Sequence, residues 1–211
     1  MTETSLLRLA DLPLDFTIDR VDRLAEAFRP LDSFHVTHAS LDGEKRYSVR
    51  REMLRAHKAA IVIPYDPATD QIVVIRQFRI GAAIQTPNAA ALELPAGLVD
   101  EGETLAQAAS RELTEETGLT ASVIKPCFTV MTSPGLCDEV AAFFLAIVDA
   151  SRLNGRAGVE EEHEDILPFA ASVDALLDAA DAGQIANGML FTALQWFARK
   201  GRGLAQQVAT E

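Results

Sequence analysis

The stretch GLVDEGETLAQAASRELTEETGL, residues 97–119, decides the central part of this fold. Thr104 is a residue type that caps helix N-termini, and Gln107 follows three residues later, as a capping box requires. Apolar residues then recur at roughly helical spacing until Gly118, a residue type that commonly ends helices in the left-handed conformation. The stretch therefore predicts a loop, a helix between Thr104 and Gly118, and a second loop.

This helix carries a high density of carboxylates. Glu112 and Glu116 lie four residues apart, so their side chains share one face. Two carboxylates about 4 Å apart repel each other by about 4 kcal/mol at an effective dielectric constant of about 20. Such crowding calls for a compensating cation, and hard oxygen ligands suit Mg²⁺ or Mn²⁺. The alternative is a solvated acidic helix with ordinary side-chain pairing.

The pattern resembles the Nudix box, the signature of hydrolases that cleave nucleoside diphosphates linked to another moiety. Every position that the box requires is satisfied in this stretch, which a chance acidic helix would not achieve. The matching residues are Gly97, Glu103, Arg111, Glu112, Leu113, Glu115, Glu116, Gly118 and Leu119. The resemblance implies an α/β fold with a mixed sheet, arranged as an α/β/α sandwich.

Composition narrows the class of partner. The 211 residues include 31 acidic and 19 basic side chains, a net charge of −12, which argues against nucleic acid or an anionic membrane as the main partner. Cys127 and Cys137 form neither a disulfide framework nor a zinc-binding spacing. The N-terminus lacks the pattern of a signal peptide, and the longest apolar run, 140–148, is too short to span a bilayer. We expect a soluble, cytoplasmic protein.

Strand patterns lie on both sides of the box. Segments 15–27 and 33–41 have strand character, and the hairpin signal Asp42-Gly43 leads to a return strand over 45–53. Buried strands are expected at 59–64 and 71–76, a polar loop at 81–91, and a short strand at 92–94. Further strands are expected near 121–131, 139–148 and 166–170, with helices near 173–182 and 188–200.

These elements divide the chain into an N-terminal β extension over 1–56, a Nudix hydrolase domain over 57–203 and a C-terminal tail over 204–211. The resemblance implies that the extension is an antiparallel sheet that crosses to a second subunit in a homodimer. The alternative is a hairpin folded back on its own domain. We favour the dimer, because long extended elements need an edge to pair with.

Three features beyond the box resemble ADP-ribose pyrophosphatases and related sugar-nucleotide enzymes. Ser133-Pro134-Gly135, followed by Glu139, resembles the marker loop of that group. In 93–97, ELPAG, a rigid Pro-Ala-Gly turn would aim the Ala96 carbonyl at the metal site. The acidic run over 159–166 resembles the catalytic loop of the family. On this resemblance, the metal ligands are Ala96, Glu112, Glu116 and Glu164.

The resemblance also assigns catalytic and substrate-binding roles. Glu162 is the expected general base, with Glu161 as the second choice, while Glu115 contributes through water and Arg111 orients the box glutamates by ion pairing. Arg51 and Arg79 are the expected phosphate or ribose contacts, and Phe28 is expected to stack on adenine. Glu52 and Glu139 are expected to accept hydrogen bonds from adenine or ribose. For Phe28, ordinary core packing is the competing interpretation.

The resulting functional prediction is Mg²⁺-dependent hydrolysis of ADP-ribose to AMP and ribose 5-phosphate, with Mn²⁺ as a possible substitute. One alternative keeps the chemistry and changes the substrate to GDP-mannose or another nucleotide sugar. A second alternative is a non-catalytic Nudix domain that senses a nucleotide, although such sensors commonly lose box glutamates and this chain keeps all of them.

Overall fold

The computed structural model describes residues 8–158 and 164–208. It divides into two compact units, which we describe separately. The first comprises residues up to His57 together with Met131–Glu139, and the second comprises Lys58–Val130 and the residues from Val140 onward. Within the described ranges, no helix is long and apolar enough to cross a membrane.

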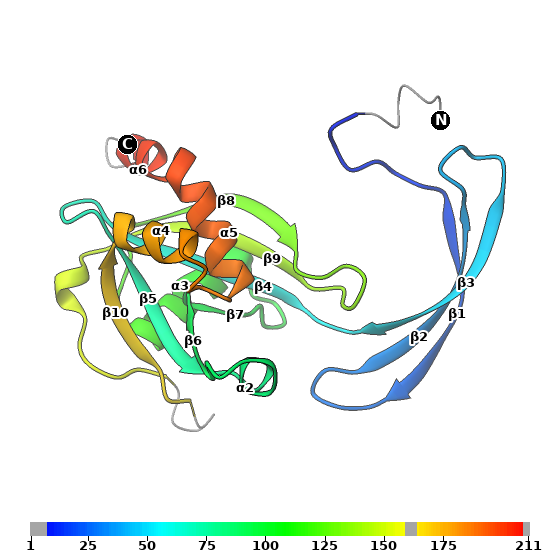
Figure 1. Ribbon diagram of the computed structural model, residues 1–211, viewed down its shortest axis with the longest axis horizontal. Coiled ribbons are helices and arrows are strands. Elements are labelled where there is room, and N and C mark those ends of the chain that lie inside the picture. Colours follow the sequence, from blue (N-terminus) through cyan, green and yellow to red (C-terminus); the bar gives the residue numbers. More distant parts are fainter. Residues whose placement is uncertain (1–7, 159–163, 209–211) are drawn as a thin grey trace. The chain divides into compact units, whose positions relative to one another are not determined.

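The first unit is a three-stranded antiparallel sheet. Strands β1 (Phe16–Ala25), β2 (Leu31–Ala39) and β3 (Arg46–Leu54) pair in sequence order (Figure 1). The expected turn between β2 and β3 is confirmed, because Gly43 has φ +80° and donates its N–H to the Ser40 carbonyl at 2.9 Å. The predicted N-terminal antiparallel extension is therefore correct.

Residues 131–139 join this unit at the end of β3. Leu54 forms a parallel β-bridge with Cys137, and its N–H donates to the Leu136 carbonyl at 2.9 Å. The marker loop itself turns at Ser133, whose carbonyl accepts the N–H groups of Leu136 and Cys137.

The second unit is built on a seven-stranded mixed sheet. The main strands lie in the order β10-β5-β4-β9-β8, with β6 paired to β5 and β7 paired to β4. Strands β4 and β9 run parallel, whereas β4 and β5 are antiparallel. The strands are β4 (Lys58–Asp66), β5 (Gln71–Phe78), β6 (Ala90–Glu93), β7 (Ala96–Leu98), β8 (Val123–Met131), β9 (Val140–Ile147) and β10 (Leu167–Ser172).

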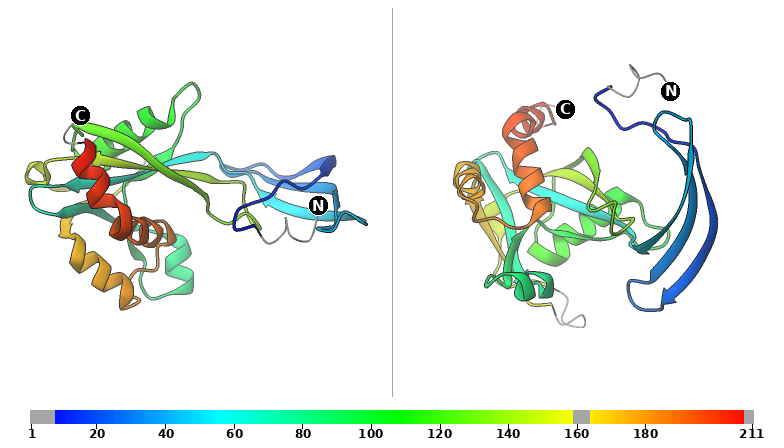
Figure 2. Two further views of the ribbon diagram at one scale, coloured as in Figure 1. Left: turned by 90° about the horizontal axis from the view of Figure 1, so that it is seen from above. Right: turned by 45° about the vertical axis from the view of Figure 1, so that its right-hand side comes forward.

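Helices cover both faces of this sheet. Helix α3 (Leu105–Thr117) lies on one face, and the helices after β10 lie on the other, as the left view of Figure 2 shows. The second group comprises α4 (Val173–Asp181), α5 (Gly188–Trp196), a π-helical turn over Phe197–Gly201 and α6 (Arg202–Val208). The predicted α/β/α sandwich is therefore confirmed.

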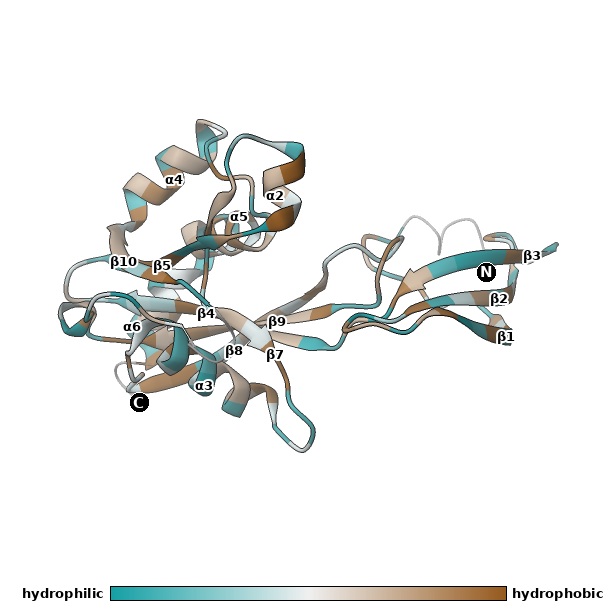
Figure 3. Cartoon of the chain, turned by 90° about the horizontal axis from the view of Figure 1, so that it is seen from below, coloured by the Kyte–Doolittle hydropathy of each residue, from teal (hydrophilic) through white to brown (hydrophobic). Residues whose placement is uncertain are grey.

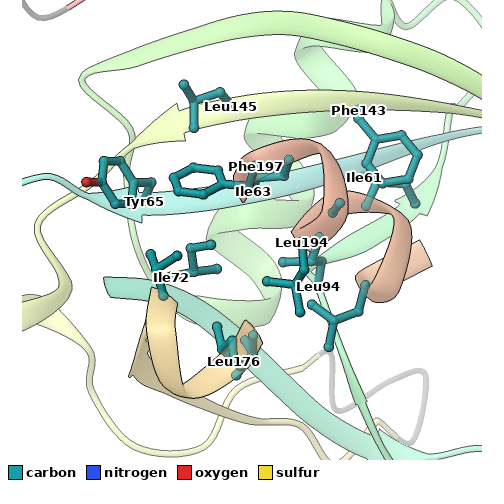
Figure 4. Close-up of a cluster of buried hydrophobic side chains, with 14 of the residues drawn as sticks. Ile61, Ile63, Tyr65, Ile72, Leu94, Phe143, Leu145, Leu176, Leu194 and Phe197 are labelled. Atoms are coloured by element: carbon teal, nitrogen blue, oxygen red, sulfur yellow. The ribbon is translucent and has the colours of Figure 1, made fainter. Parts of the chain in front are cut away.

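The two faces arise from alternation along the central strands. On β4, Ile61 and Ile63 point into the core beneath α4 to α6, whereas Ala60 and Val62 pack toward α3. In the larger core these isoleucines lie with Leu194 and Phe197 (Figure 4). Both faces of the central strands are buried, which explains their nearly continuous apolar sequence.

Three local expectations were wrong. The segment 81–91 is not wholly loop, because helix α2 covers Ile80–Gln85. Its two isoleucines, Ile80 and Ile84, are exposed, and the helix is partly brown in Figure 3, so no buried apolar stripe marks it in the sequence. Ala96–Leu98 is strand β7 rather than a turn, because it pairs with β4. Residues 204–208, expected in a tail, belong to α6, where Ala205 and Val208 are buried.

Candidate active site

The box helix α3 begins and ends as its sequence predicts. The Thr104 N–H donates to the Gln107 side chain at 2.9 Å, and the Gln107 N–H donates to the Thr104 hydroxyl at 3.3 Å. Gly118 ends the helix with φ +71°, and its N–H donates to the Thr114 carbonyl at 2.8 Å. These caps satisfy helix-end groups locally and fix the rotation of the glutamate-bearing face.

Arg111 is the cationic centre of the box. Its guanidinium donates to Glu103 at 3.1 Å, to Glu112 at 2.7 Å and to Glu115 at 2.9 Å. A further N–H reaches the Leu98 carbonyl at 2.9 Å, which ties the helix to the end of β7. One planar guanidinium therefore pairs with three box carboxylates, and the catalytic role of Arg111 stays a prediction.

Glu112 lies against the backbone at Gly97. The residue is 8% exposed, and burial raises the pKa of its carboxyl against the opposing effect of Arg111. A β-carbon on Gly97 would lie 1.8 Å from the Glu112 carboxylate oxygen Oε1. Only glycine leaves room for this carboxylate, which gives the box glycine a physical role.

Glu116 is the most deeply buried carboxylate of the box. It is 4% exposed, and its Oε2 accepts the Ala96 N–H at 2.8 Å. Burial raises the pKa of Glu116 to about 8, and the neighbouring charges of Glu112 and Glu164 add to the rise. The structure therefore brings Glu112, Glu116 and Glu164 within mutual electrostatic reach.

The described ends of the acidic segment are held beside α3. Ala157 and Ile166 exchange backbone hydrogen bonds at 2.9 and 3.1 Å, and the Gly158 N–H donates to the Glu115 carbonyl at 3.2 Å. Glu164 lies between Ala157 and Ile166 in the segment that these hydrogen bonds close. The expected base Glu162 and its alternative Glu161 lie outside the described residues.

Arg79 is fixed by a residue that sequence reasoning did not single out. Glu93, buried at the end of β6, accepts from Arg79 Nη2 at 2.8 Å, from Asn187 Nδ2 at 3.0 Å and from Gln77 Nε2 at 3.2 Å. Burial alone would lower the pKa of Arg79, but its hydrogen bonds to Glu93 keep it above the usual value. The only sequence signal was the spacing of Gln77 and Arg79 at the end of one strand.

A cavity of about 1340 Å³ adjoins this cluster. Arg76, Arg79 and Glu93 line it together with the segment 86–92 and the start of α5 at Asn187 and Gly188. The half-exposed guanidinium of Arg79 therefore faces open space while Glu93 restrains it.

The other expected substrate contacts belong to the first unit. Phe28 is 83% exposed with the Arg29 guanidinium 5.6 Å from its ring centre, so it is not a core residue. Arg51 is exposed and donates to the Arg50 carbonyl at 2.8 Å. Glu52 accepts from Arg50 at 3.0 Å, and half-buried Glu139 ends the segment that pairs with Leu54. Their roles stay predictions.

The carboxylates suit a divalent cation. Among the described residues, no three His, Cys, Asp or Glu side chains already stand at metal-binding spacing. The donor atoms are nevertheless those that a hard cation prefers, because Glu112, Glu116 and Glu164 supply carboxylate oxygens that interact electrostatically with one another. The Ala96 N–H donates to Glu116, and the role of the Ala96 carbonyl as a metal ligand stays a prediction.

An acidic box helix packed on a mixed sheet within an α/β/α sandwich defines the class of this protein. The chain belongs to the Nudix family, since a NUDIX domain matches residues 55–188. Members of this family generally use divalent metal ions.

Three curated relatives are similar to this chain over most of its length. The ADP-ribose pyrophosphatase of Escherichia coli (strain K12) is 33% identical over 196 residues, covering 90% of this chain and 94% of the relative. That of Haemophilus influenzae (strain Rd) is 34% identical over 176 residues, covering 82% and 81%. The GDP-mannose pyrophosphatase of Enterobacter sp. (strain 638) is 31% identical over 156 residues, covering 72% and 79%.

A solved structure shares the fold. The crystal structure of an ADP compounds hydrolase aligns with a TM-score of 0.65 at 21% identity, covering 92% of this chain and all of that chain.

Proposed function

We propose that this protein is a Mg²⁺-dependent hydrolase that cleaves the diphosphate of ADP-ribose to AMP and ribose 5-phosphate. The carrying observation is that the buried carboxylates of Glu112 and Glu116 lie within electrostatic reach of each other and of Glu164, with Arg111 hydrogen-bonded to Glu112. Similarity to ADP-ribose pyrophosphatases over most of the chain supports the choice of substrate.

The proposed metal ligands are the Ala96 carbonyl, Glu112, Glu116 and Glu164. Bound Mg²⁺ would neutralise the diphosphate oxygens and raise the electrophilicity of phosphorus. Within the protein, Arg111 holds Glu112 and Glu115 in fixed orientations, and the Ala96 N–H holds Glu116. This preorganisation lowers the reorganisation cost of the reaction.

The remaining steps belong to the acidic segment and to the arginines. Glu162 is the proposed base that accepts a proton from the attacking water, and Glu115 is proposed to contribute through an ordered water. Arg79 is the proposed diphosphate contact, because Glu93 fixes its guanidinium at a cavity wall. Arg51, Phe28, Glu52 and Glu139 are the proposed contacts to the nucleoside and ribose.

A substrate panel tests the proposal. Purified protein with Mg²⁺ would be offered ADP-ribose, GDP-mannose and ADP-glucose in ¹⁸O-water. We expect ADP-ribose to be hydrolysed fastest and one product phosphate to carry the label. Fastest turnover of GDP-mannose would instead support the second candidate, to which relatives covering 72% of this chain point.

We also propose that the N-terminal extension, residues 1–56, forms a homodimer in the cytoplasm. Large apolar side chains lie exposed on its sheet, more than an isolated three-stranded sheet would be expected to present to water. These residues are Phe16, Ile18, Val21, Leu24 and Tyr47. The free thiols of Cys127 and Cys137 suit a reducing compartment. Light scattering coupled to gel filtration would measure the mass, and a monomer at micromolar concentration would contradict the dimer.

A further inference from the structure

Arg55 joins the end of β3 to the segment that carries Glu139. Its Nε donates to Asp138 Oδ2 at 2.6 Å, and its Nη1 donates to Asp32 Oδ2 on β2 at 3.0 Å. The guanidinium carbon also lies 5.4 Å from the centre of the Phe34 ring. One side chain therefore links β2, the end of β3 and the marker loop.

Both carboxylate oxygens of Asp138 are occupied by this link. While Oδ2 accepts from Arg55, Oδ1 accepts the Ala56 N–H at 2.6 Å. The backbones add a second connection, because the Leu54 N–H donates to the Leu136 carbonyl at 2.9 Å. The loop is therefore held at the same point by two hydrogen bonds to the Asp138 side chain and by two backbone hydrogen bonds of Leu54, to Leu136 and from Asp138.

The other end of the link is buried. The Asp32 side chain is 3% exposed, and its second oxygen accepts from Arg23 Nε at 2.5 Å. A buried carboxylate with two arginine partners is costly to move, because separating it from either partner leaves an incompletely compensated charge. Arg55 is therefore restrained on the side facing the sheet as well as on the side facing the loop.

We propose that Arg55 and Asp138 are positioning residues for substrate recognition. Asp138 directly precedes Glu139, and Arg55 lies three residues after Glu52, so the link fixes the spacing between two predicted contacts to the nucleotide. This inference rests on the proposed function and extends it by assigning residues that set substrate affinity. Neither residue touches the substrate in this account.

The link acts by ordering the loop before substrate binds. Without it, substrate binding has to supply the free energy that immobilises the segment 133–139, and affinity falls accordingly. The proposed chemical step depends on Glu112 and Glu116 of the second unit, whose carboxylates accept from Arg111 and from the Ala96 N–H. The expected signature is a raised KM with a nearly constant kcat.

Asp138→Asn tests the link selectively. The asparagine keeps an oxygen that accepts the Ala56 N–H, but its amide group cannot accept from the Arg55 guanidinium. We expect the KM for ADP-ribose to rise about tenfold while kcat stays within about twofold of the wild type. Arg55→Lys keeps the charge but loses the forked geometry, and it should give a smaller rise.

Asp15→Asn is the matched control. It removes an exposed ion pair at 2.5 Å between Asp15, just before β1, and Arg46 on β3, and it should leave KM unchanged. Amide hydrogen exchange of residues 133–139 supplies a readout that does not depend on activity, and exchange should speed up in Asp138→Asn but not in Asp15→Asn.

The outcomes separate the two claims. Unchanged exchange in Asp138→Asn would overturn the link itself. Faster exchange with an unchanged KM, or an equal fall in kcat, would overturn the positioning role. A wild-type protein that hydrolyses no nucleotide sugar would refute the proposed function, and the link would then be judged by the exchange data alone.

Discussion

Gly97 and Glu112 share a space that has no room for a β-carbon: one built on Gly97 would stand 1.8 Å from the Glu112 carboxylate. The glycine in strand β7 and the glutamate on α3 therefore depend on each other. The strand brings its backbone against the box helix, and the carboxylate is desolvated by that approach.

Gly97→Ala is therefore expected to displace the Glu112 carboxylate. We expect kcat to fall about 100-fold or more, because the metal-binding and orienting contacts are lost together. Overpacking of a dense site costs about 1–3 kcal/mol in the free energy of unfolding. Steady-state kinetics and denaturant unfolding measure the two effects.

Gly203→Ala is the control for that substitution. Gly203 lies in α6 with no atom within 4 Å of an added β-carbon, and alanine favours a helix interior. Activity should be unchanged and stability equal or slightly higher. Wild-type activity in Gly97→Ala would contradict the claim that catalysis requires the Glu112 carboxylate at its observed position.

The Glu93 cluster predicts a combined loss of stability and affinity. Glu93→Gln keeps the shape but removes the charge that holds Arg79, and its amide group cannot accept the bonds from Arg79, Asn187 and Gln77 together. We expect the free energy of unfolding to fall by about 2 kcal/mol and the KM for ADP-ribose to rise. Urea unfolding and initial rates measure these changes, and neither changing would contradict a positioning role for Glu93.

The sequence predicts well what neighbouring residues determine. Thr104, Gln107 and Gly118 act within a few residues of one another, so the limits of α3 follow from local chemistry. Alternating or continuous apolar runs likewise predict the central strands, because burial on both faces is encoded residue by residue.

Contacts between distant residues were not predictable in the same way. Glu93 and Asn187 are 94 residues apart, and Arg55 and Asp138 are 83 apart, so only the folded chain shows that they meet. Helix α2 was not predicted because its apolar residues Ile80 and Ile84, four residues apart, face solvent rather than a core. Strand β7 forms because it pairs with β4. The local sequence Pro95-Ala96-Gly97 predicts a turn and gives no sign of this pairing.

Glu116 gives stability a specific pH dependence. Burial raises its pKa from 4.5 to about 8, so between these values the folded chain binds more protons than the unfolded chain. Stability must then fall as the pH rises: the contribution of the protonated carboxyl is complete below pH 4.5 and is lost as the pH rises through about 8. With a chelator present, we expect Tm to fall between about pH 5 and pH 8, and to fall less in Glu116→Gln.

Adding a divalent cation should reverse this trend. A cation that binds the ionised carboxylates stabilises the folded chain by mass action, and the gain should be larger at about pH 8 than at about pH 6. Thermal unfolding with and without Mg²⁺ measures the difference. A gain that is equal at both pH values, or equal in Glu116→Gln, would contradict cation binding at this carboxylate.

The acidic segment gives a kinetic prediction. If Glu162 is the base, Glu162→Gln should lower kcat by about 10²–10⁴-fold with little change in KM, since general-base assistance typically has that magnitude. Glu161→Gln is the matched variant one residue away and should retain most activity. Reversal of the two results would assign the role to Glu161 instead.

The central claim is that the box carboxylates bind divalent cations against a diphosphate. Its most direct measurement is anomalous scattering from crystals grown with Mn²⁺ and a non-hydrolysable ADP-ribose analogue. The account predicts anomalous peaks between the diphosphate and the carboxylates of Glu112 and Glu116. Bound analogue with no peak at these carboxylates, or with their side chains turned into bulk solvent, would contradict it.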